Sequence, residues 1–106
     1  MVSQKTKPTS KPKVAKATAA AAPLIVERVQ TGVKLETRML KVLKALAEYH
    51  DITLGDLLEG IVLHAFEGKS PFERATLAKI EQLKQIYAMN YDSSFAHNLK
   101  EQGAPS

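Results

Sequence analysis

The sequence predicts a mostly α-helical fold in which one β-strand per chain pairs with the same strand of a second copy, in an intermolecular antiparallel ribbon. Residues 29–35 alternate apolar and polar side chains, a period of two that is typical of a half-buried strand. No other part of the chain reads as a strand, and an unpaired strand would leave its backbone N–H and C=O groups without partners. Apolar residues at helical spacing then recur in residues 37–49, 54–66 and 71–89.

The first 22 residues differ in composition from the rest of the chain. They carry five lysines, no acidic residue and few large apolar side chains. Such a segment cannot bury enough apolar surface to offset its ordering entropy, so we expect residues 1–22 to be a disordered basic tail. Residues 23–68 then hold the strand and the first two helices, and residues 69–106 hold a third helix and a polar tail.

The net charge of +4 is unevenly distributed along the chain. It is +5 for residues 1–22, +3 for residues 23–47 and −4 for residues 48–106. This polarity suits a protein that turns its basic half toward a polyanion, although a lysine tail kept for solubility is the alternative interpretation. Cysteine is absent, and no apolar stretch is suited to a secretory signal or a membrane span. We therefore expect a cytoplasmic protein without disulfides.

The first helix is predicted at about residues 37–49. Met39, Leu43 and Leu46 are spaced three to four residues apart, which places them on one face of a helix. Leu40 and Val42 flank this face and make it broad, as the core of a dimer requires. No glycine marks the end of the helix.

The second helix is predicted at about residues 54–66. Thr53 and Asp56 form a Thr-x-x-Asp start signal, in which the threonine side chain caps the first turn. Gly55 and Gly60 each lower the helical propensity by about 1 kcal/mol relative to alanine. Close packing against another backbone would explain their use.

The third helix is predicted at about residues 71–89. Gly68 is suited to end the preceding helix in a left-handed conformation. Ser70 is then a candidate N-cap, Pro71 suits the first helical position, and Glu73 completes a capping box. The expected apolar face of this helix consists of Phe72, Thr76, Ile80, Leu83 and Tyr87.

The strand and the two helices after it resemble a known family. The residues TGVKLETR at 31–38, MLKVLKALA at 39–47 and IT at 52–53, followed by a second apolar helix, are similar to ribbon–helix–helix DNA-binding proteins of the Arc and MetJ type. The resemblance covers roughly residues 28–66. It implies an intertwined homodimer that binds double-stranded DNA, as bacterial repressors and antitoxins of this class do.

The resemblance also implies which residues contact DNA bases. Members of the family insert paired antiparallel strands into the major groove, and three alternating side chains of each strand contact base edges. These positions correspond here to Gln30, Gly32 and Lys34, with Arg28 one step further out. Gln pairs with adenine, and Lys favours guanine. Gly32 departs from the family pattern because it has no side chain to read a base; either two side chains carry the specificity, or the backbone approaches the DNA closely there.

Phosphate contacts are expected at the start of the second helix, near Thr53, Leu54 and Gly55. The resemblance implies these contacts, and the unpaired N–H groups and positive dipole of a helix N-terminus favour an anion. Capping of the helix is the alternative role of Thr53.

Basic side chains of the first helix are further candidates for phosphate contacts. Arg38, Lys41 and Lys44 follow one another at intervals of three residues and therefore share a helix face, which is either a phosphate-binding row or a solvated surface. The basic tail would bind DNA without sequence preference. Its cations are Lys5, Lys7, Lys11, Lys13 and Lys16.

No enzymatic chemistry is expected. Residues 92–97 contain Asp, Ser and His, but a hydrolytic triad is assembled by a fold and not by a contiguous polar segment. His50, His64 and His97 are too scattered for a metal site. We therefore expect no catalytic residue, no metal and no cofactor.

Two functions from different classes remain open. The first is a dimeric transcriptional repressor that binds specific DNA, with an antitoxin or plasmid-maintenance role as a narrower version. The second is a dimeric protein-interaction module, for a toxin or another partner, without specific DNA readout; the acidic second half and Gly32 favour it. A protein that coats DNA without sequence preference is a third possibility. The helix at 71–89 either packs on its own dimer or binds a protein partner.

Overall fold

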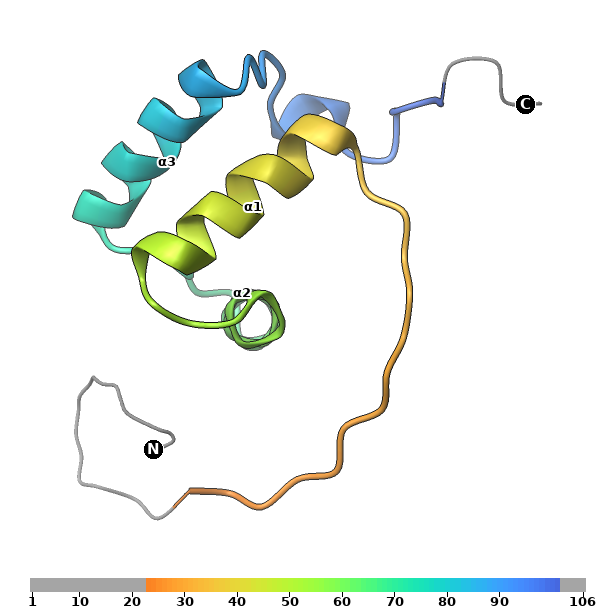
Figure 1. Cartoon of the computed structure of the whole chain (residues 1–106), viewed down its shortest axis with the longest axis vertical. Coiled ribbons are helices and arrows are strands. Elements are labelled where there is room, and N and C mark those ends of the chain that lie inside the picture. Colours follow the sequence, from red (N-terminus) through yellow and green to blue (C-terminus); the bar gives the residue numbers. More distant parts are fainter. Residues whose placement is uncertain (1–22, 102–106) are drawn as a thin grey trace. The chain divides into compact units, whose positions relative to one another are not determined.

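The computed structural model describes residues 23–101, and all of its regular structure follows residue 36 (Figure 1). Three α-helices of equal length occupy this part of the chain: α1 (Thr37–Tyr49), α2 (Leu54–Phe66) and α3 (Arg74–Ile86). A short 3₁₀ turn, η1 (Ser93–Phe95), follows them. Residues 23–32 and residues 33–101 belong to separate parts of the chain, and the helices lie in the second part.

The predicted strand and its ribbon are absent from the described residues, so this part of the expected fold is wrong. Residues 23–36 form an irregular trace that leads into α1 (Figure 1). Val29 and Val33 are 83% and 74% exposed, so the alternating pattern does not produce a half-buried face. A strand is stable only where a neighbouring strand pairs with its backbone, and no segment of residues 23–101 does so. The fold is a mostly helical one without a sheet in this region.

The ends of α1 and α2 agree with the prediction. Glu36 caps α1 with its own side chain, since Oε1 accepts a hydrogen bond from the backbone N–H of Met39 at 3.1 Å. Thr53 caps α2, because its Oγ1 accepts from the N–H of Asp56 at 3.0 Å. This is the capping that the Thr-x-x-Asp signal predicts.

Helix α3 begins three residues later and ends three residues earlier than predicted. Its N-cap is Glu73, which makes no side-chain capping bond. The hydroxyl of Ser70 donates instead to the carbonyl of Phe72, so the expected capping box does not form. At the other end, the chain leaves the helix at Tyr87.

All three helices end in the same way, with a residue in the left-handed conformation just after the C-cap. These residues are Asp51, Gly68 and Ala88, with φ of 58°, 70° and 57°. In each case the N–H groups of this residue and of the residue after it donate to carbonyls of the last helical turn, as in a Schellman motif. Gly68 was predicted in this role; the other two positions show that the motif tolerates residues other than glycine.

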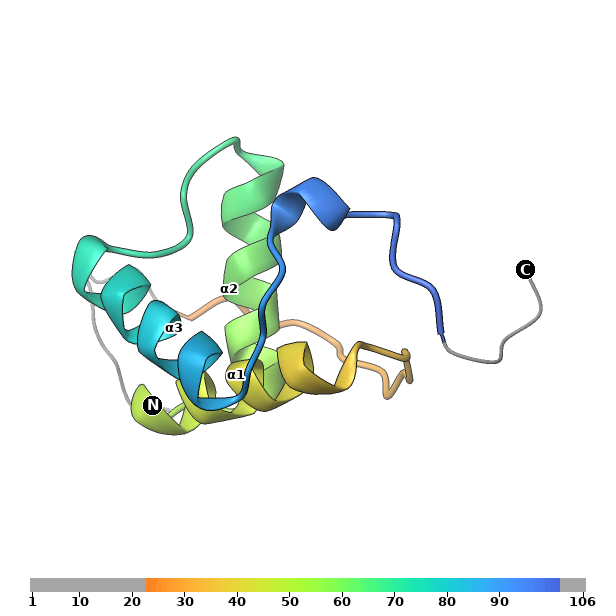
Figure 2. The same ribbon diagram turned by 90° about the horizontal axis from the view of Figure 1, so that it is seen from above.

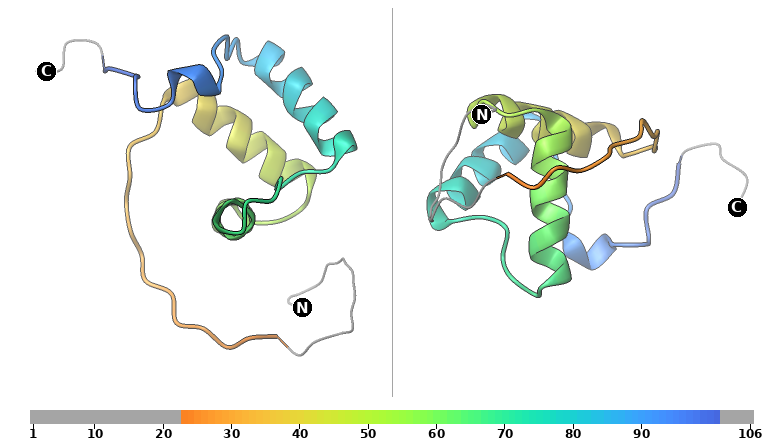
Figure 3. Two further views of the ribbon diagram at one scale, coloured as in Figure 1. Left: turned by 180° about the vertical axis from the view of Figure 1, so that it is seen from behind. Right: turned by 90° about the horizontal axis from the view of Figure 1, so that it is seen from below.

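The core lies where α1 meets α2 and α3. Helix α1 runs beside α3, and α2 crosses it, as the views from above and behind both show (Figures 2 and 3). The buried apolar side chains of the described residues are Val42, Leu46, Ala47 and Leu57. The side chains packed around them are Leu43, Ile52, Ile61, Phe72, Ile80 and Leu83.

Helix α3 thus packs on α1 of its own chain through part of its predicted apolar face. The ammonium of Lys79 lies 4.8 Å from the centre of the Tyr49 ring, and Thr76 lies beside His50. Leu77 and Ile86 of α3 remain exposed. None of the helices within residues 23–101 combines the length and the apolar character that crossing a membrane requires.

Candidate functional site

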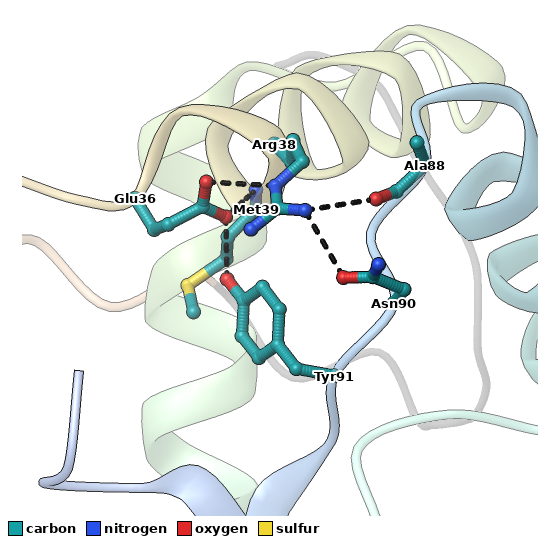
Figure 4. Close-up of polar contacts among 6 residues, drawn as sticks. All are labelled: Glu36, Arg38, Met39, Ala88, Asn90 and Tyr91. Atoms are coloured by element: carbon teal, nitrogen blue, oxygen red, sulfur yellow. Dashed lines mark hydrogen bonds and ion pairs between the residues drawn. The ribbon is translucent and has the colours of Figure 1, made fainter.

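The start of α1 is joined to the segment after α3 by a polar cluster of four residues: Glu36, Arg38, Asn90 and Tyr91 (Figure 4). The hydroxyl of Tyr91 donates to Oε1 of Glu36 at 2.6 Å. Oε2 of the same carboxylate accepts from Nε of Arg38 at 3.0 Å. Glu36 therefore caps the helix and holds two side chains, one of them from 55 residues further along the chain.

These contacts shift two pKa values in opposite directions. The hydrogen bond from Tyr91 lowers the pKa of Glu36 to about 2, with further contributions from Arg38 and Met39. Desolvation, together with the hydrogen bond to the carboxylate, raises the pKa of Tyr91 to about 12. Both shifts favour the pair in its bonded form, an ionised carboxylate with a protonated phenol.

Arg38 is the centre of the cluster. Its Nη1 donates to the backbone carbonyl of Ala88 at 3.1 Å and to Oδ1 of Asn90 at 3.0 Å. The guanidinium carbon also lies 5.4 Å from the centre of the Tyr91 ring, within the range of a cation–π interaction. This residue, a predicted phosphate contact, is thus held by other parts of the chain (Figure 4).

Lys41 and Lys44 have a different environment. Both are exposed, and neither forms an ion pair with a carboxylate within residues 23–101. Positions 41 and 44 are three residues apart on α1, so the two ammonium groups lie on the same side of the helix. They form an exposed cationic pair on α1 that faces solvent.

The N-terminus of α2 is partly occupied by its own cap. Thr53 and Gly55 are exposed and Leu54 is half-buried, and the Thr53 side chain accepts from the N–H of Asp56. The backbone N–H groups at the start of this helix point away from the helix body and favour an anion. The carboxylate of Asp56 in the same turn opposes one.

The predicted base contacts are surface residues without regular structure. Arg28, Gln30 and Gly32 lie in residues 23–32 and are exposed. Lys34 lies in the other part of the chain, and its ammonium is 3.8 Å from a carboxylate oxygen of Glu101. Nothing approaches within 4 Å of a Cβ placed on Gly32. The predicted lysines of residues 1–22 lie outside the described residues.

A second exposed surface is apolar. In the last two turns of α2, the large apolar side chains of Val62, Leu63 and Phe66 face solvent. Phe66 is 82% exposed. We call these three residues the α2 apolar surface. Gly60 of the same helix has open space around it, since nothing lies within 4 Å of a Cβ placed there.

Within residues 23–101, no group of three or more His, Cys, Asp or Glu side chains is placed to hold a metal ion. The ring of His64 bonds to the carbonyl of Gly60 in its own helix. Asp92 and Ser94 bond to each other in the 3₁₀ turn, and the hydrogen bonds from Ser94 lower the pKa of Asp92.

No family model, no curated protein and no solved structure matches this chain.

The sequence alone does not identify Glu36, Asn90 or Tyr91 as members of a site. Glutamate is not a preferred N-cap residue, so the capping role of Glu36 has no clear sequence signal. The contact with Tyr91 joins positions 55 residues apart, and no periodicity along the chain reports such a pairing.

Proposed function

We propose that the protein binds double-stranded DNA as a homodimer and acts as a transcriptional repressor in the cytoplasm, on the nucleoid. The observation that carries the proposal is the exposed cationic pair Lys41 and Lys44, which has no acidic partner within residues 23–101. Residues 1–47, which contain this pair, carry all of the excess positive charge of the chain. Binding of phosphates by such cations releases counterions, which is a main source of affinity for DNA.

Sequence preference would come from the exposed segment before α1. Gln30 and Lys34 are exposed there, and both side chains have hydrogen-bonding groups that match base edges. Thr53, Leu54 and Gly55 would add backbone N–H groups toward a phosphate, as helix N-termini do. Narrower roles as an antitoxin or a plasmid-maintenance regulator belong to the same proposal.

Binding of a selected duplex tests the role of the cationic pair. A plot of the logarithm of the DNA-binding constant against the logarithm of the salt concentration has a slope to which each phosphate contact contributes about 0.9. In the double variant Lys41→Gln/Lys44→Gln this slope should therefore be less steep by about 1.8. The double variant Lys69→Gln/Lys84→Gln is the matched control, because its lysines are paired with Glu67 and Glu81 in the acidic half of the chain.

Equal loss of affinity in both double variants would show that net charge alone drives binding, and it would contradict the assignment to α1. Selection of an enriched motif from a random DNA pool at physiological salt tests sequence preference. Binding without an enriched motif would favour a protein that coats DNA.

The dimer is proposed because one chain buries little apolar surface. Only four apolar side chains of residues 23–101 are buried, whereas a small domain without disulfides needs a larger core. The α2 apolar surface brings together three exposed large apolar side chains on one helix, and a second copy of the chain presents an equivalent surface to it. Gly60 would allow the second backbone to come close.

Sedimentation of the full chain at micromolar concentration tests the dimer. Phe66→Ser should weaken the dimer about tenfold or more, because burial of an aromatic side chain is worth about 1.5–3 kcal/mol. Leu77→Ser on α3 is the control, since Leu77 is also exposed but lies outside the α2 apolar surface. A wild-type chain that remains monomeric would contradict the proposal.

A protein-interaction module is the second candidate. It is favoured by the α2 apolar surface and by Asp56, whose carboxylate lies at the helix N-terminus where a phosphate would bind. In that case the dimer would persist, while the lysine variants and the wild type would show the same weak binding to every duplex.

A further inference from the structure

The guanidinium of Arg38 has one donor occupied at each of the two edges through which arginine binds an anion. A bidentate contact uses Nη2 together with either Nε or Nη1. Nε donates to Glu36, and Nη1 donates to the Ala88 carbonyl and to Asn90. Neither edge therefore has both of its donors available for a phosphate while these contacts last (Figure 4).

Most of these contacts come from a segment that has little structure of its own. Within residues 88–101, the only regular element is η1, of three residues. The segment is joined to α1 by Asn90 and Tyr91, and Glu101 lies 3.8 Å from the ammonium of Lys34. These contacts occur at partly or fully exposed side chains, so each is expected to be weak enough to break.

The same segment, residues 88–101, has a net negative charge, whereas Lys34 and Arg38 near the start of α1 are basic. Its carboxylates are Asp92 and Glu101, against one cation, Lys100. Glu101 partners Lys34, and Asn90 supplies a neutral amide oxygen to Arg38. In each case an oxygen of the chain contacts a cation of the kind that binds a phosphate oxygen.

We propose that residues 88–101 form an intramolecular competitor of DNA, which holds Arg38 and Lys34 in a closed state and releases them when a phosphate takes their place. This inference rests on the proposed DNA binding and assigns a regulation to the same surface. In the closed state Lys41 and Lys44 remain available, so DNA is first bound without Arg38. Release of the segment then adds one bidentate phosphate contact per chain.

The double variant Asn90→Ala/Tyr91→Phe tests the competition in the full chain. It removes two side-chain attachments of the segment and leaves Arg38 intact. Affinity for the selected duplex should rise about twofold to fivefold, the range expected for one exposed ion pair. The salt slope should rise by about 0.9 per added phosphate contact. Tyr87→Phe/Asn98→Ala makes the same chemical changes at nearby residues that do not contact Arg38, and it should have no effect.

Arg38→Gln completes the test as a double-mutant cycle. In the wild-type background it should lower DNA affinity by less than in the Asn90→Ala/Tyr91→Phe background, because the phosphate contact of wild-type Arg38 replaces its contacts with residues 88–101. In the Asn90→Ala/Tyr91→Phe background it should abolish the gain. Circular dichroism of each variant checks that the helices are retained, and Glu101→Gln, which frees only Lys34, provides a second and milder release.

The outcomes separate this inference from the proposed function. The competition is supported if Asn90→Ala/Tyr91→Phe binds DNA more tightly than the wild type and if Arg38→Gln removes this gain. This holds even where the wild type shows no binding. Binding by the wild type that is unchanged or weakened in both released variants overturns the competition and leaves the proposed function standing. Absence of DNA binding in wild type and variants alike overturns both.

Discussion

At the scale of single residues, Glu36 connects parts of the chain that are far apart in the sequence. Its carboxylate caps α1, accepts the Tyr91 hydroxyl and pairs with Arg38. One side chain thus ties a helix start to a distant segment. Since the carboxylate is only partly shielded from solvent, we expect each of its bonds to be worth about 1 kcal/mol, at the lower end for a charged acceptor.

The pH dependence of the Glu36–Tyr91 pair is a direct prediction. The pKa of Glu36 is lowered from 4.5 to about 2, so its stabilisation is present above about pH 4.5 and is lost as pH falls toward 2. The pKa of Tyr91 is raised from 10.0 to about 12, so its stabilisation is present below about pH 10 and is lost as pH rises toward 12. Tyr91→Phe should therefore lower the free energy of unfolding by about 1 kcal/mol near neutral pH, and by less at both extremes.

Urea unfolding of wild type and Tyr91→Phe across pH measures this difference. Ultraviolet titration of the phenols, with Tyr91→Phe subtracted, should also show a tyrosine whose pKa lies above its ordinary value of 10.0. A difference in stability that is constant from acid to alkaline pH would contradict the assigned hydrogen bond.

At the scale of elements, the three helices end in the same way. Three consecutive helices stop with a left-handed residue, and two of these residues, Asp51 and Ala88, are not glycine. A non-glycine residue in this conformation costs about 1 kcal/mol. Ala88 also supplies its carbonyl to Arg38. The strain at the end of α3 therefore lies beside the polar cluster.

Ala88→Gly should stabilise the chain by about 0.5–1 kcal/mol, because glycine adopts this conformation without strain and keeps the carbonyl in place. Thermal unfolding should show a midpoint higher by a few degrees. Gly68→Ala is the reciprocal control: nothing within 4 Å would contact the new Cβ, so its expected loss of about 1 kcal/mol is purely conformational. A lower midpoint for Ala88→Gly would show that strain does not limit this helix end.

At the scale of the whole molecule, the core is small and depends on one helix. Leu46 of α1 is 1% exposed, and it lies between side chains from α2 and α3. Large apolar residues outside this core face solvent, among them Phe66 of α2. Within residues 23–101, stability is thus concentrated in a few contacts around Leu46.

Leu46→Ala should be the most destabilising truncation in α1, at about 2–5 kcal/mol, since the cavity would open at the junction of all three helices. Val42→Ala, at a buried position with a smaller side chain, should cost less. Denaturant titration followed by circular dichroism gives both values. Equal costs at the two positions would show that Leu46 is not the centre of the core.

Local signals in the sequence determined much of the helical part of this protein. Residue spacing and the Thr53 cap fixed the extents of α1 and α2, and Gly68 marked the end of α2. These features depend on side chains within one turn of each other. The charge distribution along the chain, and with it the prediction of a polyanion as partner, also follows from the sequence alone.

Only the tertiary structure decided whether residues 29–35 form a strand and where the segment after α3 lies. Alternation predicts a strand, but a strand also needs a neighbour, which the described residues do not supply. The pairing of Glu36 and Arg38 with Asn90 and Tyr91 closes a loop of about 50 residues. Because such a contact depends on how α1 and α3 pack, and not on local spacing, it is visible only once the chain is folded.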